Sequence, residues 1–125
     1  MSVSAYAAGD SVSSVLGFAL DSLALRQRTI ADNIANLETP GFRASAVDFE
    51  STLRAAVARG ESVGAVLAGR SPALTPSGTP VGANDNNVDL GTETLAAVQS
   101  QFQYQLLSRA VTDRFELVRT AAGAV

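Results

Sequence analysis

The chain has 125 residues, 46% of them apolar, and a formal net charge of −3, which allows one small domain with a modest core. It contains no His, Cys or Trp, and all nine basic residues are Arg, so Lys is absent too. Without these residue types the usual zinc, haem and iron–sulfur ligand sets, thiol nucleophiles, Ser–His dyads and Schiff-base lysines cannot be built. Because the Arg residues are scattered, the sequence predicts no nucleic-acid surface. We also expect no cofactor and no small-molecule substrate. Only a carboxylate-based enzyme stays open.

The start of the chain lacks the features of a secretory signal. The first basic residue is Arg26, and the preceding apolar stretch is interrupted by Ser13, Gly17 and Asp21. Nothing approaches the roughly 18 uninterrupted apolar residues of a membrane span. Composition alone therefore predicts a cytoplasmic protein with no cleaved signal peptide and no membrane insertion.

Residues 11–37 are expected to form a long N-terminal helix, capped at its start by Asp10 or Ser11. Its apolar residues recur at spacings of three and four, with Gln27 in the one gap, which is typical of a helix that packs lengthwise on another helix. They are Leu16, Leu20, Leu23, Ile30, Ile34 and Leu37. A turn at 39–41 ends the helix, because the residue before Pro40 leaves the helical region and Gly41 accepts the positive φ of a type II turn.

The segment 38–59 combines this turn with a short linker, 42–47, and a short helix. Phe49, Leu53 and Val57 lie four apart on one face of the helix. Asp48 is its expected N-cap, and Gly60 stands at the C′ position where glycine is common.

The middle of the chain, residues 60–87, is expected to be a flexible loop. It holds five of the ten glycines and three of the four prolines, and its apolar periodicity is lost. Either it is a plain linker or it orders against neighbouring subunits.

Residues 89–122 are expected to form a C-terminal helix of roughly 50 Å, with Asp89 as N-cap and Glu93 favourable to the helix dipole. Its apolar face widens toward the C-terminus and is too broad for one antiparallel partner. The face comprises Leu95, Val98, Phe102, Leu106 and Ala110, beside Leu107, Val111, Phe115, Val118 and Ala122. The predicted fold is mainly α: one domain, 1–125, with two long terminal helices packed as a hairpin or coiled coil, a short third helix and an irregular middle. Its thin core would be completed on assembly.

Two local patterns could indicate binding or chemistry. Residues 85–89 match the opening of a calcium loop, but Leu90 replaces the required Gly and Ala96 the required Glu, so an Asx-rich turn is the better interpretation. Asp48 and Glu50 are favoured as a solvated helix start over a catalytic pair.

Two amides and one aromatic residue also stand out. Asn33 has poor helix propensity, so its amide is expected to bond either a neighbouring helix or the loop after Gly41, and Asn36 is expected in the helix end. Tyr104, among glutamines, suits either an inter-subunit contact or a half-buried core position.

The first helix end and the turn that follows carry a resemblance to a known family. Residues 30–36 and 39–42 resemble the N-terminal signature A-x-N-I-A-N-x-x-T-x-G-[FY] of the bacterial flagellar axial proteins, which build the rod and hook. Three further stretches are similar to those of rod members of that family: Arg43-Ala44 with Val47-Asp48-Phe49-Glu50, the run 86–90, and the pattern of Tyr104, Leu107 and 115–121. Together they cover about two thirds of the chain. The positions carried over as signature or assembly residues are Asn33, Ile34, Ala35, Asn36, Thr39, Pro40, Gly41, Phe42, Asp48, Phe49, Asn87, Val88, Asp89, Tyr104, Leu106 and Phe115.

The resemblance implies a structural, non-enzymatic subunit of the cell-proximal rod of the flagellar basal body. It implies export through the type III apparatus without a cleaved signal, which would replace the cytoplasmic location by one outside the cytoplasmic membrane. Expected partners are other rod proteins, the membrane-ring adapter FliE and further copies of the chain, and the expected work is transmitting torque and forming the export channel. Alternatives are another axial subunit, or a cytoplasmic helical binding module or export chaperone.

Overall fold

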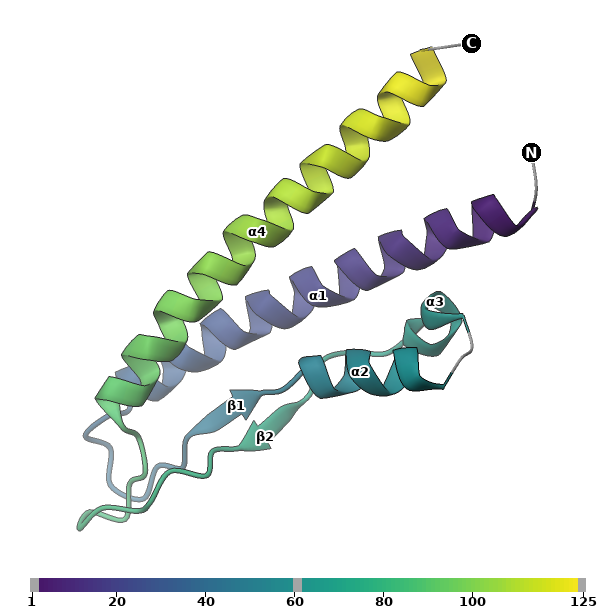
Figure 1. Ribbon diagram of the computed structural model, residues 1–125. Coiled ribbons are helices and arrows are strands. Elements are labelled where there is room, and N and C mark those ends of the chain that lie inside the picture. Colours follow the sequence, from purple (N-terminus) through teal and green to yellow (C-terminus); the bar gives the residue numbers. More distant parts are fainter. Residues whose placement is uncertain (1–2, 60–61, 124–125) are drawn as a thin grey trace.

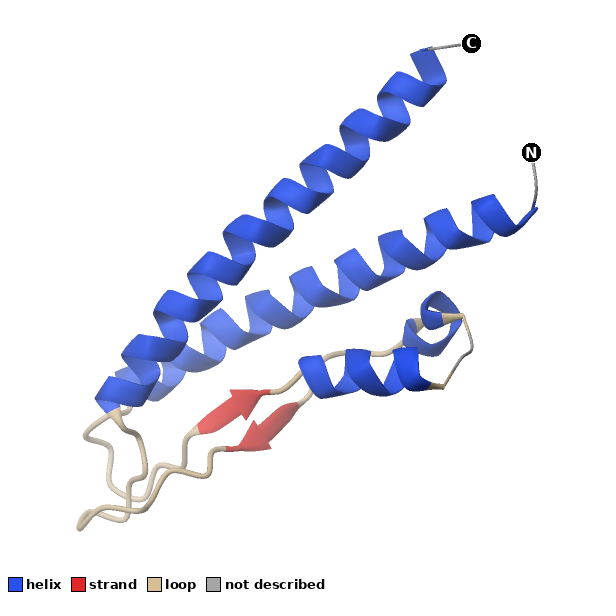
Figure 2. Ribbon diagram, in the orientation of Figure 1, coloured by secondary structure: helices blue, strands red, loops and turns tan. Residues whose placement is uncertain are grey.

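The computed structural model describes residues 3–59 and 62–123, with side chains from residue 12 onward. In chain order the elements are α1 (Val3–Ala35), β1 (Ser45–Val47), α2 (Glu50–Ala58), α3 (Val63–Leu67), β2 (Leu74–Pro76) and α4 (Leu90–Gly123). Helix dominates the chain (Figure 2), so the prediction of a mainly α fold with two long terminal helices is confirmed.

The two long helices are antiparallel and lie closest where α1 ends and α4 begins (Figure 1). From there they diverge toward the two chain termini. The face of α4 turned to α1 is identified by two hydrogen bonds, from Asn33 to Glu93 and from Arg26 to Gln103. Ser100 lies on the same face and is fully buried. Near the start of α4 the contact therefore includes hydrogen bonds and buried polar residues, unlike the purely apolar seam of a coiled coil.

A second layer packs on the opposite side of α1 (Figure 1). Strands β1 and β2 form an antiparallel pair with Ser45 opposite Pro76 and Val47 opposite Leu74. Strand β1 and helix α3 contact α1, and α2 contacts α3. The apolar core lies between these elements and α1, and α4 adds to it only the partly buried Leu107. Its buried members are Phe18, Ala19, Leu23, Val47, Phe49, Ala56 and Leu67.

The middle of the chain corrects one sequence prediction. Residues 60–87 were expected to form an irregular loop unable to bury a face, yet they contain α3 and β2, and Leu67 of α3 is buried in the core. A single helical turn needs only two or three apolar residues to pack, which is too few to register as a periodic pattern. Strand β1 likewise replaces part of the linker expected at 42–47.

Helix limits and one apolar stripe also differ from expectation. Helix α1 begins at Val3, so neither Asp10 nor Ser11 is its cap, because the Ala-rich start favours helix. Leu23 and Ile30 are buried as expected, but Ile34 is exposed and Phe18 belongs to the core instead. The buried residues of α1 differ from the expected stripe because α4 packs on one side of the helix and β1 with α3 on the other. The expected C′ role of Gly60 lies outside the described residues.

Candidate functional site

The end of α1 is tied to both layers through the amide of Asn33, which is almost fully buried. Its Nδ2 donates to the Ser45 carbonyl at 2.8 Å and to the Glu93 carboxylate at 3.1 Å, while its Oδ1 accepts from the Ser45 N–H at 3.2 Å. The amide therefore bonds both the loop and the neighbouring helix, the two options that the sequence left open. An aliphatic side chain here would leave the buried Glu93 carboxylate without this donor.

The turn after α1 has the predicted type II form. Gly41 has φ +76°, and the Phe42 N–H donates to the Thr39 carbonyl at 3.2 Å across Pro40. Just before the turn, the Thr39 hydroxyl donates to the Asn36 amide oxygen at 3.1 Å. Asn36 is therefore part of the helix end, as expected, and Phe42 leaves the turn partly buried.

The segment before α4 closes this turn from the other side. Asn86 Nδ2 donates to the carbonyls of Asn36 and Thr39, both at 2.8 Å, and so gives each of these turn carbonyls a second hydrogen bond beside its backbone one. Asn87 accepts from the Ala44 N–H at 2.6 Å, and the partly buried Val88 donates its N–H to the Asn86 amide oxygen. The run that resembled a calcium loop is an Asx-rich turn in the structure.

Asp89 and Asp48 both accept hydrogen bonds from the first turn of the helix that follows, but the N-cap position of α2 is Phe49 and not the predicted Asp48. Asp89 accepts from the Thr92 N–H at 2.8 Å, and this backbone hydrogen bond lowers the pKa of the Asp89 carboxyl. Asp48 accepts hydrogen bonds from the Ser51 hydroxyl at 2.6 Å and from the Ser51 N–H at 3.1 Å. Both bonds lower the pKa of the Asp48 carboxyl, and the bond from the hydroxyl has the larger effect. The carboxylates hold the starts of α4 and α2 in place.

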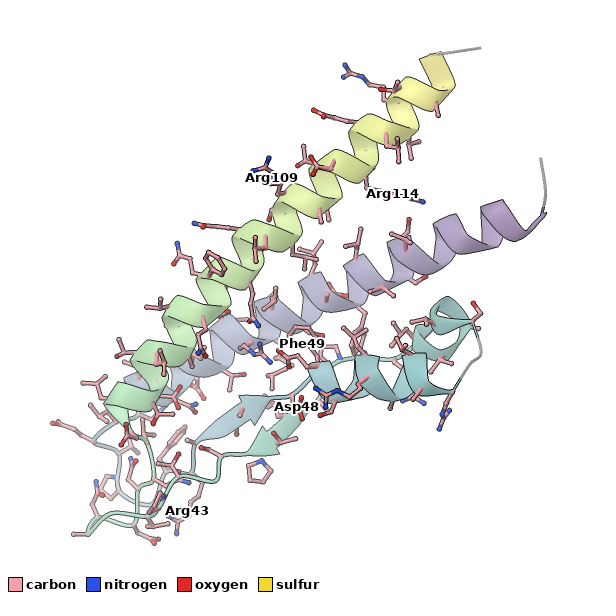
Figure 3. All side chains as sticks on the ribbon, viewed as in Figure 1. Arg43, Asp48, Phe49, Arg109 and Arg114 are labelled. Atoms are coloured by element: carbon pink, nitrogen blue, oxygen red, sulfur yellow. The ribbon has the colours of Figure 1, made fainter. Side chains whose placement is uncertain are left out.

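Arg26 was not singled out in the sequence, yet it joins three elements. Its guanidinium donates to the Val47 carbonyl at 2.6 Å, to Glu50 at 2.7 Å and to Gln103 at 2.9 Å. It also lies 4.6 Å from the ring centroid of Phe49, a favourable cation–π distance. Phe49 is labelled in Figure 3 between α2 and α1, so it is a core residue rather than a surface residue.

The Glu50 carboxylate is the acidic partner in this cluster. Partial burial acts to raise its pKa, but the hydrogen bond from Arg26 leaves that pKa below the ordinary value. A sequence signal for Arg26 existed: it lies one heptad before Asn33, on the same face of α1. Glu93, expected only to favour the helix dipole, is likewise a buried partner of Asn33.

The remaining signature residues lie on the surface. Ile34 and Ala35 are exposed on α1, and Tyr104, Leu106 and Phe115 are exposed on α4, Phe115 to 70%. Most other large apolar residues of α4 are also exposed in the described chain. These are Leu90, Leu95, Val98, Phe102, Leu117 and Val118.

Residues 3–59 and 62–123 contain neither a metal-type cluster nor a membrane-length apolar helix. No group of three or more acidic side chains is gathered as a metal site would require. No helix within these ranges is both long and apolar enough to cross a bilayer.

These features define a class of protein: an elongated helical chain whose two long terminal helices meet through hydrogen bonds and leave many apolar side chains of α4 exposed. Comparisons with known proteins identify the family. Residues 15–43 match the family model described as "Flagella basal body rod protein". The flagellar basal body rod protein FlgB of Borreliella burgdorferi is 32% identical over 79% of this chain and 86% of that protein.

Two further relatives carry the same name. The FlgB protein of Bacillus subtilis is 29% identical over 82% of this chain and 85% of its own length. That of Escherichia coli is 30% identical over 78% and 83%, respectively. The chain belongs to the FlgB family of flagellar basal body rod proteins. It is a structural subunit of the basal-body rod, located in the flagellum and assembling with other rod components.

Proposed function

We propose that this subunit builds the cell-proximal end of the rod, where it transmits torque, borders the export channel and contacts the adapter FliE as well as further copies of itself. The observation that carries the proposal is the amount of surface left open. The chain exposes 8280 Å². A compact monomer of 12.8 kDa is expected to expose about 6,300 Å².

The excess of about 2,000 Å² is larger than the roughly 800 Å² that one partner contributes to a standard interface. It therefore supports contacts with more than one neighbour, as a tubular wall requires. Tyr104, Leu106 and Phe115 are assigned to these contacts, since all three side chains are exposed on α4. Asn33 and Asn87 are assigned instead to holding the turn that sets the direction of α4.

The proposal includes the absence of catalysis. The whole sequence lacks His, Cys and Lys, which removes most nucleophiles and general bases. Its two neighbouring carboxylates, Asp48 and Glu50, are occupied by Ser51 and by Arg26, respectively.

The test is motility in cells that carry Leu106→Asp or Phe115→Asp. Both positions are exposed, so the monomer should fold, but a buried charge should stop rod assembly at an early stage and abolish swimming. The matched control is Gln101→Glu, an exposed change on the same helix outside the apolar face, which should swim normally. Normal rods with both Asp variants would overturn the proposal, as would recovery of the native protein only from the soluble cytoplasmic fraction and never from purified basal bodies.

FliE contact is tested separately. A photo-crosslinking residue in place of Phe115 should capture FliE or a rod subunit in purified basal bodies. If crosslinkers at every exposed α4 position capture rod subunits but never FliE, then FliE is not a partner of this helix. The assignment to the rod would stand.

A further inference from the structure

The divergence of α1 and α4 leaves an apolar groove of about 350 Å³ in the described chain. Its walls include Ala19 and Leu23 on α1 and Phe49 just before α2. On α4 the lining residues are Gln103, Leu106, Leu107 and Ala110. The one charged side chain in its lining, Glu50, is already paired with Arg26. A partner that enters this groove therefore meets a surface with no unpaired charge.

A second apolar surface runs along another side of α4. We call it the outer stripe: Leu95, Val98 and Phe102, all exposed and none of them in the lining of the groove. At about 100° per residue, the stripe is centred well away from Ser100, whose face is turned to α1. The surrounding sequence, residues 94–108, contains no Asp, Glu, Lys or Arg, and spans about 22 Å of helix. Interface cores are depleted of charged residues in the same way.

We propose that the outer stripe of one copy docks into the groove of a second copy of this chain. The inference rests on the proposed function and names the surfaces through which identical subunits meet. Donor and acceptor surfaces are different parts of the same molecule, so the contact is heterologous.

A second copy is the occupant because both surfaces that match are on this chain. The groove needs a helix face that is apolar and uncharged along its length. The exposed side of α1 carries Asp21, Arg28 and Asp32, and that of α2 carries Arg54, so their docking would strip water from charges. The outer stripe has no such residue.

The area and the symmetry agree with this occupant. A chain that uses its stripe and its groove at the same time makes two contacts, and each standard contact buries roughly 800 Å² of one partner's surface. Two such contacts fit within the chain's excess accessible surface of about 2,000 Å². A heterologous contact that does not close on itself generates an open helical assembly rather than a dimer. That is the geometry of a rod.

The experiment uses two single variants of the full chain and their mixture. Val98→Glu places a charge in the stripe, and Ala110→Glu places one in the groove wall; both positions are exposed. Sedimentation velocity over a concentration series should show association of the native chain beyond a dimer. Each variant alone should weaken association at least tenfold, and Gln101→Glu should match the native chain.

The mixture supplies the decisive result. Ala110→Glu retains an intact stripe and Val98→Glu an intact groove, so together they should form a one-to-one pair that stops at two chains. Circular dichroism of each variant checks that helix content is unchanged, and Phe102→Glu serves as a second stripe variant if Val98→Glu does not fold.

Other outcomes overturn the inference without touching the rod assignment. Association of Ala110→Glu alone at native strength would indicate stripe-to-stripe pairing, and association of Val98→Glu alone would indicate groove-to-groove pairing. A native chain that stays monomeric, but is still recovered from basal bodies, would mean that a different rod protein fills the groove. Absence from basal bodies would instead count against the proposed function.

Discussion

The two long helices are nearly equal in length, 33 and 34 residues, but they use their apolar residues in opposite ways. Helix α1 turns them inward: Phe18, Leu23 and Ile30 are buried. Helix α4 turns a polar face to α1, through Glu93 and Gln103, and leaves its apolar residues outside.

The apolar residues of α1 stabilise the monomer, whereas those of α4 are available for contacts with neighbouring subunits. The body formed by α1, the β1–β2 strand pair, α2 and α3 has a conventional apolar core. Helix α4 adds to it the partly buried Leu107 and two hydrogen bonds, with Asn33 and Arg26. Burial is worth about 25 cal/mol per Å² of apolar area, so α4 gains much of its stabilisation only when another molecule covers it. The predictions below test this contrast in order of expected effect.

The strongest test compares one leucine from each helix. Leu23→Ala removes a side chain that is 1% exposed and should lower the free energy of unfolding by about 2–5 kcal/mol. Leu106→Ala removes one that is 57% exposed and should change it by no more than about 0.5 kcal/mol. Urea denaturation followed by circular dichroism measures both. Equal losses would contradict the division between the helices.

The polar link between the helices is tested at Asn33. Asn33→Ala leaves the buried Glu93 carboxylate without that donor and should cost about 1–3 kcal/mol of unfolding free energy. In a double-mutant cycle with Glu93→Ala, the two changes should couple by at least about 0.5 kcal/mol. Additive effects would show that the hydrogen bond does not attach α4. Gln101→Ala, on the exposed side of α4, is the control for a surface substitution.

The turn between α1 and β1 depends on Gly41. Its φ of +76° is unfavourable for any residue with a Cβ, so Gly41→Ala should cost about 1–2 kcal/mol although the space around it is open. Gly17→Ala is the matched control, because Gly17 lies inside α1 with nothing near its Cβ position, and it should stabilise by about 0.5–1 kcal/mol. Thermal unfolding distinguishes the two signs.

The smallest expected effect is the pH dependence of the α4 cap. Hydrogen bonding lowers the folded-state pKa of Asp89 below its ordinary value of 3.8. Its contribution to stability is therefore present above that value and is lost as the pH falls through the lower folded-state pKa. Asn can also cap a helix but does not titrate. The Tm difference between the native chain and Asp89→Asn should thus shrink between pH 6 and pH 2.5, and a difference independent of pH would contradict the assignment.

Local chemistry explains the parts of the structure that could be predicted. Periodic apolar residues over many turns indicated both long helices, and Pro40 with Gly41 indicated the type II turn, because these features depend on residues close in sequence. Asp89 as a cap follows from the same short-range logic. Helix α3 and strand β2 were missed, since Leu67 and Leu74 acquire their roles only from α1 and β1, far away in the chain.

The sequence by itself determined the two long helices and the turn that follows the first of them. Through its signature residues it also determined the resemblance to flagellar axial proteins. Only the tertiary structure decided which face of each helix is covered. Helix α4 carries both an apolar and a small polar face, and either could in principle meet α1. Asn33 and Arg26 select the polar one through hydrogen bonds to Glu93 and Gln103, because side chains 60 and 77 residues apart must be brought together before their geometry has any effect. That selection leaves the apolar face of α4 to other subunits.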